Sequence, residues 1–365
     1  MKIVNTGNLY RIYSDDLKTY DQLPANTYLV NFSQMSGFYL ELYPNIAVTE
    51  KIYGVHEEKV SKILNSFNLF ERNLGVILSG DKGIGKSICA KLLSQRSVEA
   101  GYPTIIVNTY VPGIADYLTS INQEVVILFD EFDKTFGAKE DSRPQEEMLT
   151  LFDGLSQGKK MFVITCNEIH RLNEFLVNRP GRFHYHLRFD YPTPEEITEY
   201  LHDKLPEIAY PEITKVVDFS AKVKINYDCL RAIAFELTQG DTFEDAIKDL
   251  NIVNVDREYY KITAYFADGS KTGSRDDCVD LFANEARETW LRYNRNFSID
   301  ITYNPADAKY SDKLFCSVVM GTDVTIEWEY DEDSVSKEEI AAMENKKLAY
   351  ITLEKKYDKP LHYLV

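Results

Sequence analysis

We predict an α/β fold in which a parallel sheet is covered by helices and followed by a purely helical segment. Three observations predict this order. Four short apolar runs alternate with helical patterns, residues 194–252 show only amphipathic helical patterns, and aromatic-rich alternating runs lie before and after these regions. A chain of 365 residues exceeds what one hydrophobic core usually supports, so we expect two or three domains.

The first fifty residues predict a small β domain. They contain near-alternating runs at 9–13, 27–32 and 37–43, separated by Asp, Pro, Asn and Gly. From about Val55 the pattern becomes helical. The expected strands of the parallel sheet are the apolar runs 75–80, 104–109, 124–130 and 160–165.

The residues after the helical segment predict an α+β domain. A helical pattern at 276–294 stands between strand patterns at 259–269, 296–304, 313–321, 323–330 and 348–358. The predicted domains are therefore 1–50 (β-rich), 51–192 (α/β), 193–252 (helical) and 253–365 (α+β).

The amino-acid composition argues against a protein that binds nucleic acid without sequence preference, a disulfide-rich protein and a membrane protein. Lys and Arg number 41 against 58 Asp and Glu, and the resulting net charge of −17 repels a phosphate backbone unless positive charge is concentrated locally. The five cysteines are widely spaced without a CxxC pair, which predicts reduced thiols. Because no apolar signal segment and no apolar run of about 18 residues occurs, we expect a cytoplasmic protein that does not bind membranes.

The motif that carries most information is LSGDKGIGKS at 78–87. It matches GxxxxGK[ST], and it follows an apolar strand and precedes a helix. In such a loop, glycines let backbone N–H groups face a phosphate, Lys86 reaches the β and γ oxygens of ATP, and Ser87 offers its hydroxyl to Mg²⁺. A glycine-rich turn without a ligand is the alternative. The expected nucleotide-binding residues are Gly80, Asp81, Lys82, Gly83, Ile84, Gly85, Lys86, Ser87 and Ile88.

An acidic pair follows the third apolar strand. In VVILFDEFDK, Asp130 stands where it can hold the magnesium through water, and Glu131 stands where it can orient and polarise an attacking water. Alone, such a pair is often a solvated turn, but after a phosphate-binding loop it is the expected second half of a hydrolytic site. Asp133 is either a partner of this site or surface charge.

Together these motifs resemble an AAA+ ATPase over about residues 52–252. The resemblance implies a P-loop parallel sheet with a helical lid. Asn167, at the end of the strand in MFVITCNE, matches the polar sensor that positions water near the γ-phosphate. Arg179 and Arg182 in LVNRPGRF have the RPGR spacing of the AAA clade, where both arginines reach the nucleotide of the neighbouring subunit. The segment 149–160 is similar to the helix that relays nucleotide state between subunits.

The same resemblance suggests further nucleotide contacts. Ile52, Tyr53 and Gly54 stand where the family contacts adenine, although a strand-to-helix turn with a core tyrosine explains them equally well. Arg231 begins a helix of the predicted lid, where many AAA+ members carry a second sensor arginine. Members with RPGR usually lack that arginine, so a surface role for Arg231 is the alternative.

A pore loop for threading an unfolded chain is not expected. Tyr110, Val111 and Gly113 stand roughly where threading members carry an aromatic-hydrophobic-Gly loop, but the segment is short and Pro112 stiffens it. It resembles the mitochondrial AAA chaperone that carries folded iron–sulfur protein, and a turn at a helix start is the preferred interpretation.

Several other features receive no catalytic role. His184 and His186 alternate on a strand without an evident third ligand, which favours structural roles over a metal site. The acidic run 327–333 reads as a solvated face, and the segment 137–147 reads as a mobile loop facing a pore or a neighbouring subunit.

We expect a homo-oligomer, a hexamer with ATP and Mg²⁺ at its interfaces, because arginines supplied in trans make an isolated subunit a poor enzyme. Hydrolysis would change the angle between the sheet and the lid and so move whatever the flanking regions hold. In layout the chain also resembles ATPases of large tailed bacteriophages, which would place it in the host cytoplasm.

Three functions remain open. The acidic charge favours remodelling of a protein client over nucleic-acid binding. A DNA-associated loader or replication ATPase would need a basic surface, and residues 253–365 contain 15 Lys and Arg against 22 Asp and Glu. An ATP-dependent assembly switch that hardly turns over is disfavoured by the intact Glu131.

Overall fold

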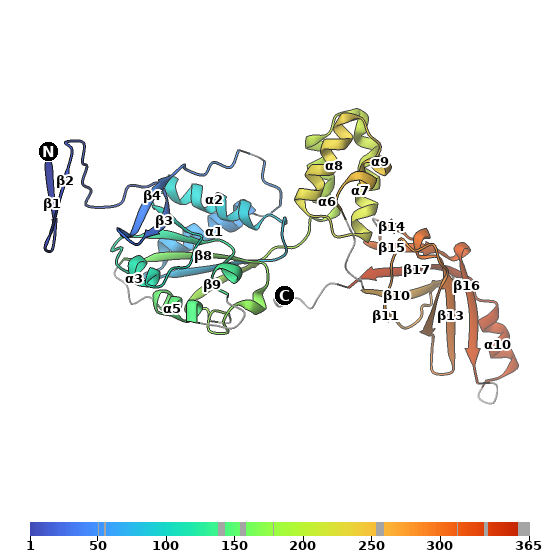
Figure 1. Ribbon diagram of the computed structural model, residues 1–365. Coiled ribbons are helices and arrows are strands. Elements are labelled where there is room, and N and C mark those ends of the chain that lie inside the picture. Colours follow the sequence, from blue (N-terminus) through green and yellow to red (C-terminus); the bar gives the residue numbers. More distant parts are fainter. Residues whose placement is uncertain are drawn as a thin grey trace. The chain divides into compact units, whose positions relative to one another are not determined.

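A computed structural model describes two compact units, Met1–Tyr191 (unit 1) and Pro192–Val365 (unit 2). Figure 1 shows them as an α/β unit and a unit in which helices precede sheets. The described residues are 1–49, 51–54, 56–137, 143–153, 158–177, 179–252, 259–311, 313–331 and 335–356.

Unit 1 is built on a seven-stranded sheet with the order β4-β3-β6-β7-β8-β5-β9. Every neighbouring pair is parallel except β3 and β4, which are antiparallel. The strands are β3 (Thr27–Ser33), β4 (Gly37–Tyr43), β5 (Leu74–Ser79), β6 (Thr104–Val107), β7 (Val125–Phe129), β8 (Lys160–Cys166) and β9 (Phe183–Arg188).

Helices cover both faces of this sheet (Figure 1), as its continuous apolar strands require. Along β7, Val126 and Leu128 pack in the cluster that contains residues of α1 and α2, whereas Ile127 and Phe129 pack in the cluster that contains residues of α3, α4 and α5. The helices are α1 (His56–Leu69), α2 (Lys86–Glu99), α3 (Ile114–Thr119), α4 (Phe132–Thr135) and α5 (Arg143–Phe152).

The N-terminal strands belong to two sheets rather than to one β domain. β1 (Lys2–Thr6) and β2 (Leu9–Tyr13) form a two-stranded antiparallel sheet, the small N-terminal sheet that the sequence predicts. β3 and β4 instead extend the large sheet, because β3 pairs with β6 from Thr27 to Leu29. Val30 on β3 packs in the main apolar core, so this hairpin is held by the α/β unit.

Unit 2 begins with four helices in the segment 194–252, which the sequence predicts to be helical. Side-chain caps start three of them: Thr193 forms a capping box with Glu196, and Asn226 and Thr242 each accept a hydrogen bond from the backbone three residues on. The helices are α6 (Pro194–Lys204), α7 (Tyr210–Lys222), α8 (Tyr227–Gln239) and α9 (Phe243–Asp249).

The rest of unit 2 is β-rich and shares one apolar core. Its sheets have the orders β11-β10-β17-β15-β14 and β12-β13-β16. The elements are β10 (Tyr259–Phe266), β11 (Arg275–Cys278), β12 (Arg287–Arg292), β13 (Phe297–Tyr303), β14 (Lys309–Ser311), β15 (Cys316–Met320), β16 (Val324–Tyr330), α10 (Lys337–Glu344) and β17 (Leu348–Lys355). Short 3₁₀ helices lie at Ile169–Arg171, Glu207–Ala209, Pro305–Asp307 and Gly321–Asp323.

The helix predicted at 276–294 is wrong. The segment forms β11 and β12 with a loop between them. Phe282, Ala286 and Trp290 recur at helical spacing, yet the two aromatic residues are 42% and 40% exposed and do not form a buried helix face. In β12 burial alternates instead, with Thr289 and Leu291 inside, and the strand pairs with β13 along its whole length. Long-range pairing has overridden the local pattern.

The structure describes only part of the predicted acidic run 327–333 and of the predicted loop 137–147. Residues 138–142 of the segment 137–147, and residues 332 and 333 of the run 327–333, lie outside the described residues. Among the helices that the structure describes, none has both the length and the apolar character that crossing a bilayer requires.

Candidate functional site

The glycine-rich loop connects a fully buried strand to a helix. All six residues of β5 are buried, and α2 begins at Lys86. Gly80, Gly83 and Gly85 all have positive φ, which favours glycine at each. A Cβ atom at Gly80 would lie 2.4 Å from the carbonyl oxygen of Phe189. The loop therefore keeps its shape only with glycine at that position.

Lys86 is buried at the centre of this loop, although it carries a charge. Its ammonium group donates hydrogen bonds to the carbonyl oxygens of Gly80, at 2.6 Å, and Asp81. Burial lowers the pKa of Lys86, while nearby carboxylates, including those of Asp133 and Asp130, oppose that shift. The cation is thus held by the loop backbone and interacts electrostatically with Asp130, which follows β7, and with Asp133 on α4.

The other loop residues differ in exposure. Ile84 is buried and fixes the loop to the core, whereas Lys82 and Ser87 are exposed. The carboxylate of Asp81 accepts a hydrogen bond from the hydroxyl of Tyr191 at 2.9 Å. Ile88 lies in the first turn of α2 and is half-buried.

Asp130 and Glu131 form a tight turn directly after β7. Glu131 has φ 47° and ψ 49°, a left-handed conformation that is uncommon for a residue with a side chain. Its carboxylate is half exposed and accepts a hydrogen bond from Lys134. That bond is the main cause that lowers the pKa of Glu131, so the carboxylate is ionised at neutral pH.

Asn167 follows β8 and is fixed by Asp133. The Asp133 side chain is only 1% exposed, and its Oδ2 accepts hydrogen bonds from the backbone N–H groups of Asn167 at 3.1 Å and Glu168 at 3.2 Å. The Asn167 amide also lowers the pKa of Glu131, although its buried Nδ2 makes no hydrogen bond of normal geometry with the described residues. Asp133 is therefore a buried partner of the site and not surface charge.

Sheet order brings these three segments together. β8 lies between β7 and β5, all three strands are parallel, and their carboxyl ends therefore share one edge. The N–H of Gly80 donates to the carbonyl oxygen of Cys166 at 3.3 Å, which joins the loop to the end of β8, directly before Asn167. The glycine-rich loop, the acidic pair and Asn167 are thus neighbours.

The donor set fits a magnesium nucleotide. Magnesium prefers hard oxygen ligands, and Ser87 and Asp130 offer a hydroxyl and a carboxylate at this edge. Backbone N–H groups in the loop and at the start of α2 suit the phosphates, because a helix N-terminus attracts anions. Bound magnesium would neutralise charge that develops on the phosphates.

Arg179 and Arg182 lie at the opposite end of the strands. The backbone oxygen of Arg179 accepts hydrogen bonds from the N–H groups of Arg182 and Phe183, where β9 begins. Arg182 makes a two-pronged ion pair with Asp153, with Nη2 2.6 Å from Oδ2, and it also donates to the carbonyl oxygen of Phe175 at 2.9 Å. Arg179 is exposed and lies 5.3 Å from the centre of the Phe175 ring.

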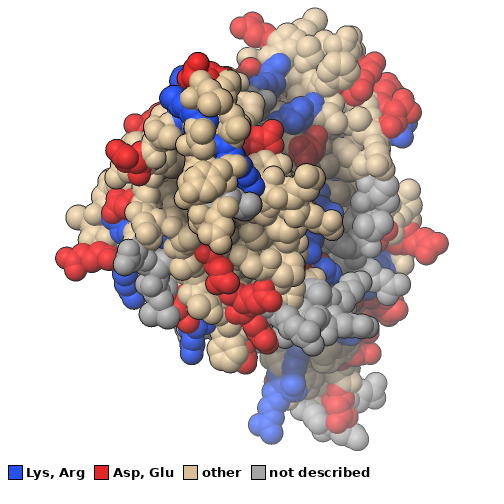
Figure 2. Space-filling view, turned by 60° about the vertical axis from the view of Figure 1, so that its left-hand side comes forward, with Lys and Arg blue, Asp and Glu red and all other residues tan. Residues whose placement is uncertain are grey.

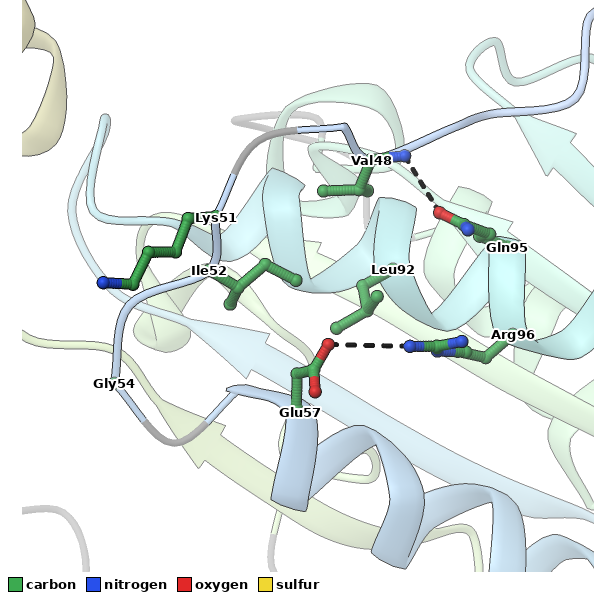
Figure 3. A pocket seen from close by; sticks show the side chains of 8 residues that line it. All are labelled: Val48, Lys51, Ile52, Gly54, Glu57, Leu92, Gln95 and Arg96. Carbon is green, nitrogen blue, oxygen red and sulfur yellow. Dashed lines mark hydrogen bonds and ion pairs between the residues drawn. The ribbon is translucent and has the colours of Figure 1, made fainter. Parts of the chain in front are cut away.

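The residues expected to contact adenine divide into two groups. Ile52 and Gly54 line a pocket of about 430 Å³, together with residues of α1 and α2. Figure 3 shows that Ile52 and Leu92 lie within this pocket and that an ion pair joins Glu57 and Arg96 across it. Tyr53 is buried instead, and its backbone oxygen lies 2.9 Å from Nδ1 of His56. Tyr53 therefore fits the core role that the sequence left open.

Arg231 lies outside unit 1. It is on α8 of unit 2, exposed, with its guanidinium 3.8 Å from the carboxylate of Asp228. Tyr110 is not presented as a free aromatic side chain either, because its hydroxyl donates to Glu147 at 2.6 Å and its ring packs edge-on against Phe136. Gly113 caps the start of α3, which agrees with the helix-start interpretation.

Sequence reasoning missed two residues of the site. Thr165 on β8 contacts both acidic residues: its hydroxyl donates to Asp130 and accepts from the N–H of Glu131. Asp153 pairs with Arg182. The position of Thr165, two residues before Asn167, is a sequence signal that could have found it. Nothing in the sequence reveals the role of Asp153.

Comparison with known proteins agrees with this geometry. Residues 76–191 match the profile of the ATPase family associated with various cellular activities (AAA). The chain is 26% identical over 175 residues to a putative ribosome biogenesis ATPase of Dictyostelium discoideum. The matched region covers 40% of this chain and 20% of that protein. It is 25% identical over 222 residues to an ATPase family AAA domain-containing protein of Arabidopsis thaliana. That matched region covers 51% of this chain and 18% of that protein.

The chain spans about a fifth of the length of these curated relatives. The family match and the site occupy the same stretch, and a domain of this family implies ATP hydrolysis with magnesium. Residues 76–191 are therefore an AAA ATPase domain, distantly related to those of eukaryotic AAA proteins.

Proposed function

We propose that the protein hydrolyses MgATP at the interfaces of a homo-oligomeric ring, a hexamer, and uses the resulting movement to remodel a protein client. Lys86 would bind the β and γ phosphates, Ser87 and Asp130 the magnesium, and Glu131 would activate water that Asn167 positions. The lowered pKa of Glu131 keeps its carboxylate ionised, which is the form that can orient and polarise water.

The position of Arg179 and Arg182 is the observation that carries this proposal. Phe183 at the start of β9 pairs with Gly75 on β5, whereas the P-loop begins at Gly80. At about 3.3 Å per residue, roughly 17 Å along the strand separates the arginines from their own loop. Arg179 is exposed and far from the P-loop of its own chain, which supports a role at a neighbouring subunit's nucleotide, whereas Arg182 would have to leave its ion pair with Asp153 to act there.

Charge supports a protein client over DNA. Figure 2 shows Lys and Arg side chains interspersed with Asp and Glu over the face in view. The overall charge of −17 opposes binding to a phosphate backbone. A DNA-associated ATPase is the second candidate, because DNA-associated ATPases have domains similar to this one. A place in the cytoplasm, and kinship with ATPases of tailed bacteriophages, remain predictions from the sequence.

The test is the ATPase rate per subunit as a function of protein concentration, with sedimentation in parallel. We expect the rate per subunit to rise with concentration as an ATP-dependent assembly forms. A Glu131→Gln variant should bind ATP, fail to hydrolyse it and accumulate as the assembly. A rate per subunit that is constant down to concentrations where the protein sediments as a monomer would overturn the shared site. Stimulation by duplex or single-stranded DNA, and not by an unfolded protein, would reverse the choice of client.

A further inference from the structure

Thr165 lies between the two acidic residues of the site. It is on β8, 2% exposed, and level with the turn that follows β7, because Phe129 pairs with the preceding residue Ile164. Its Oγ1 is 2.7 Å from Oδ1 of Asp130 and 2.8 Å from the backbone nitrogen of Glu131. A hydroxyl has one donor hydrogen and two acceptor lone pairs, so it makes both bonds at once.

The turn that Thr165 contacts has an uncommon backbone conformation. Among the described residues, Glu131 and Phe315 are the non-glycine residues with positive φ. Such conformations persist where the surroundings hold them. On the carboxyl side, the backbone oxygen of Glu131 accepts hydrogen bonds from Lys134 and Thr135, each at 2.9 Å. On the amino side, the N–H of Glu131 is held by the Thr165 hydroxyl.

We propose that Thr165 is a positioning residue for the hydrolytic step. Its single hydroxyl fixes the Asp130 carboxylate and the backbone of Glu131 relative to each other, so that the group expected to hold magnesium and the group expected to activate water keep one geometry. This inference rests on the proposed function, because it assigns Thr165 to the reaction of that site.

The proposal separates hydrolysis from binding. The groups expected to bind phosphate lie in the P-loop. Among the described residues, none of them is hydrogen-bonded to Thr165. Thr165→Val keeps the shape of the side chain and removes both hydrogen bonds. Because one of them is to a charged group, we expect kcat to fall about 10- to 100-fold while KM for ATP changes less than about threefold. Thr165→Ser keeps the hydroxyl and should recover most of the loss.

Thr104→Val is the matched control. Thr104 is a fully buried threonine at the amino end of β6 in the same sheet, and its hydroxyl has no hydrogen-bond partner among the described residues. The substitution makes the same chemical change away from the catalytic edge, so it should leave kcat and KM as in the parent. Thermal melting of each variant checks that the fold is retained.

The experiment measures steady-state ATP hydrolysis and amide hydrogen exchange of the peptide that contains Glu131, in the full chain. Slower hydrolysis and faster exchange in Thr165→Val, with recovery of both in Thr165→Ser, are the expected results. Parent kcat and parent exchange in Thr165→Val would overturn the inference and leave the proposed function intact. If the parent itself fails to hydrolyse ATP, the proposed function fails. Exchange at Glu131 then still decides whether the Thr165 contact holds the turn.

Discussion

Asp133→Ala tests whether a buried carboxylate holds Asn167, the residue proposed to position water. The substitution leaves the partly buried backbone N–H groups of Asn167 and Glu168 without their acceptor. Each unsatisfied group costs about 1 to 3 kcal/mol. Removing a buried carboxylate, whose Oδ1 has no partner among the described residues, offsets part of that cost. We therefore expect unit 1 to lose about 2 to 4 kcal/mol of stability.

Asp133→Asn is the matched comparison, because its amide oxygen can still accept both hydrogen bonds. Only the assistance of the charge is lost, so we expect a loss of about 1 kcal/mol. In both variants the ATPase rate should fall more than ATP affinity, and it should fall further in Asp133→Ala. Asp190→Ala removes an exposed carboxylate near a surface arginine and should change stability by less than about 0.5 kcal/mol.

The assay can distinguish the two units. Both tryptophans, Trp290 and Trp328, lie in unit 2, so their fluorescence during urea unfolding reports that unit alone. Far-UV circular dichroism reports both units. We expect Asp133→Ala to move a circular-dichroism transition to lower urea and to leave the fluorescence transition unchanged. Unchanged stability and an unchanged ATPase rate would refute the assigned role of Asp133.

Three further predictions follow from the site. Gly80→Ala should abolish ATP binding, measured by equilibrium titration, because its Cβ would collide with backbone and its φ is +141°; retained affinity would contradict the loop geometry. Lys134→Ala should move the acidic limb of the pH profile of kcat to higher pH, because Glu131 loses the hydrogen bond that lowers its pKa. The stability that this bond contributes is present above the pKa of Glu131 in the unfolded chain and is lost as pH falls through its pKa in the folded protein. An acidic limb that does not move would contradict the role assigned to Glu131. Burial raises the pKa of Cys89 and Cys166 to about 12, so iodoacetamide at pH 8 should leave both unmodified in the native protein, as mass spectrometry would show.

The sequence predicts the local parts of the site and the strand pattern of the sheet. The P-loop and the pair Asp130 and Glu131 are contiguous motifs with a strand before them, so position along the chain is enough to place them. Thr165 and Asp133 could not be assigned, because their roles depend on β8 lying beside β7. Burial settles Asp133, which the sequence leaves open between surface charge and a site partner.

Long-range pairing explains where the predicted organisation and the structure differ. β3 joins the large sheet through β6, a strand far along the chain, and no local pattern reveals that contact. In β12, spacing that also suits a helix becomes a strand because β13 pairs with it. The partner of Arg182 is likewise invisible in sequence, since Asp153 meets it only in the folded unit.

The central claim is that each active site is shared between two subunits. Lys86→Ala keeps the arginines and loses the phosphate-binding cation, whereas Arg179→Ala keeps the P-loop and loses an arginine. Each variant alone should hydrolyse ATP at least about 100-fold more slowly than the parent. Mixing the two variants and measuring the ATPase rate is the most direct test, because in mixed assemblies an intact P-loop can meet an intact Arg179. We predict that the mixture recovers a substantial part of the parent rate. A mixture as slow as its components, or an Arg179→Ala variant at the parent rate, would contradict the account.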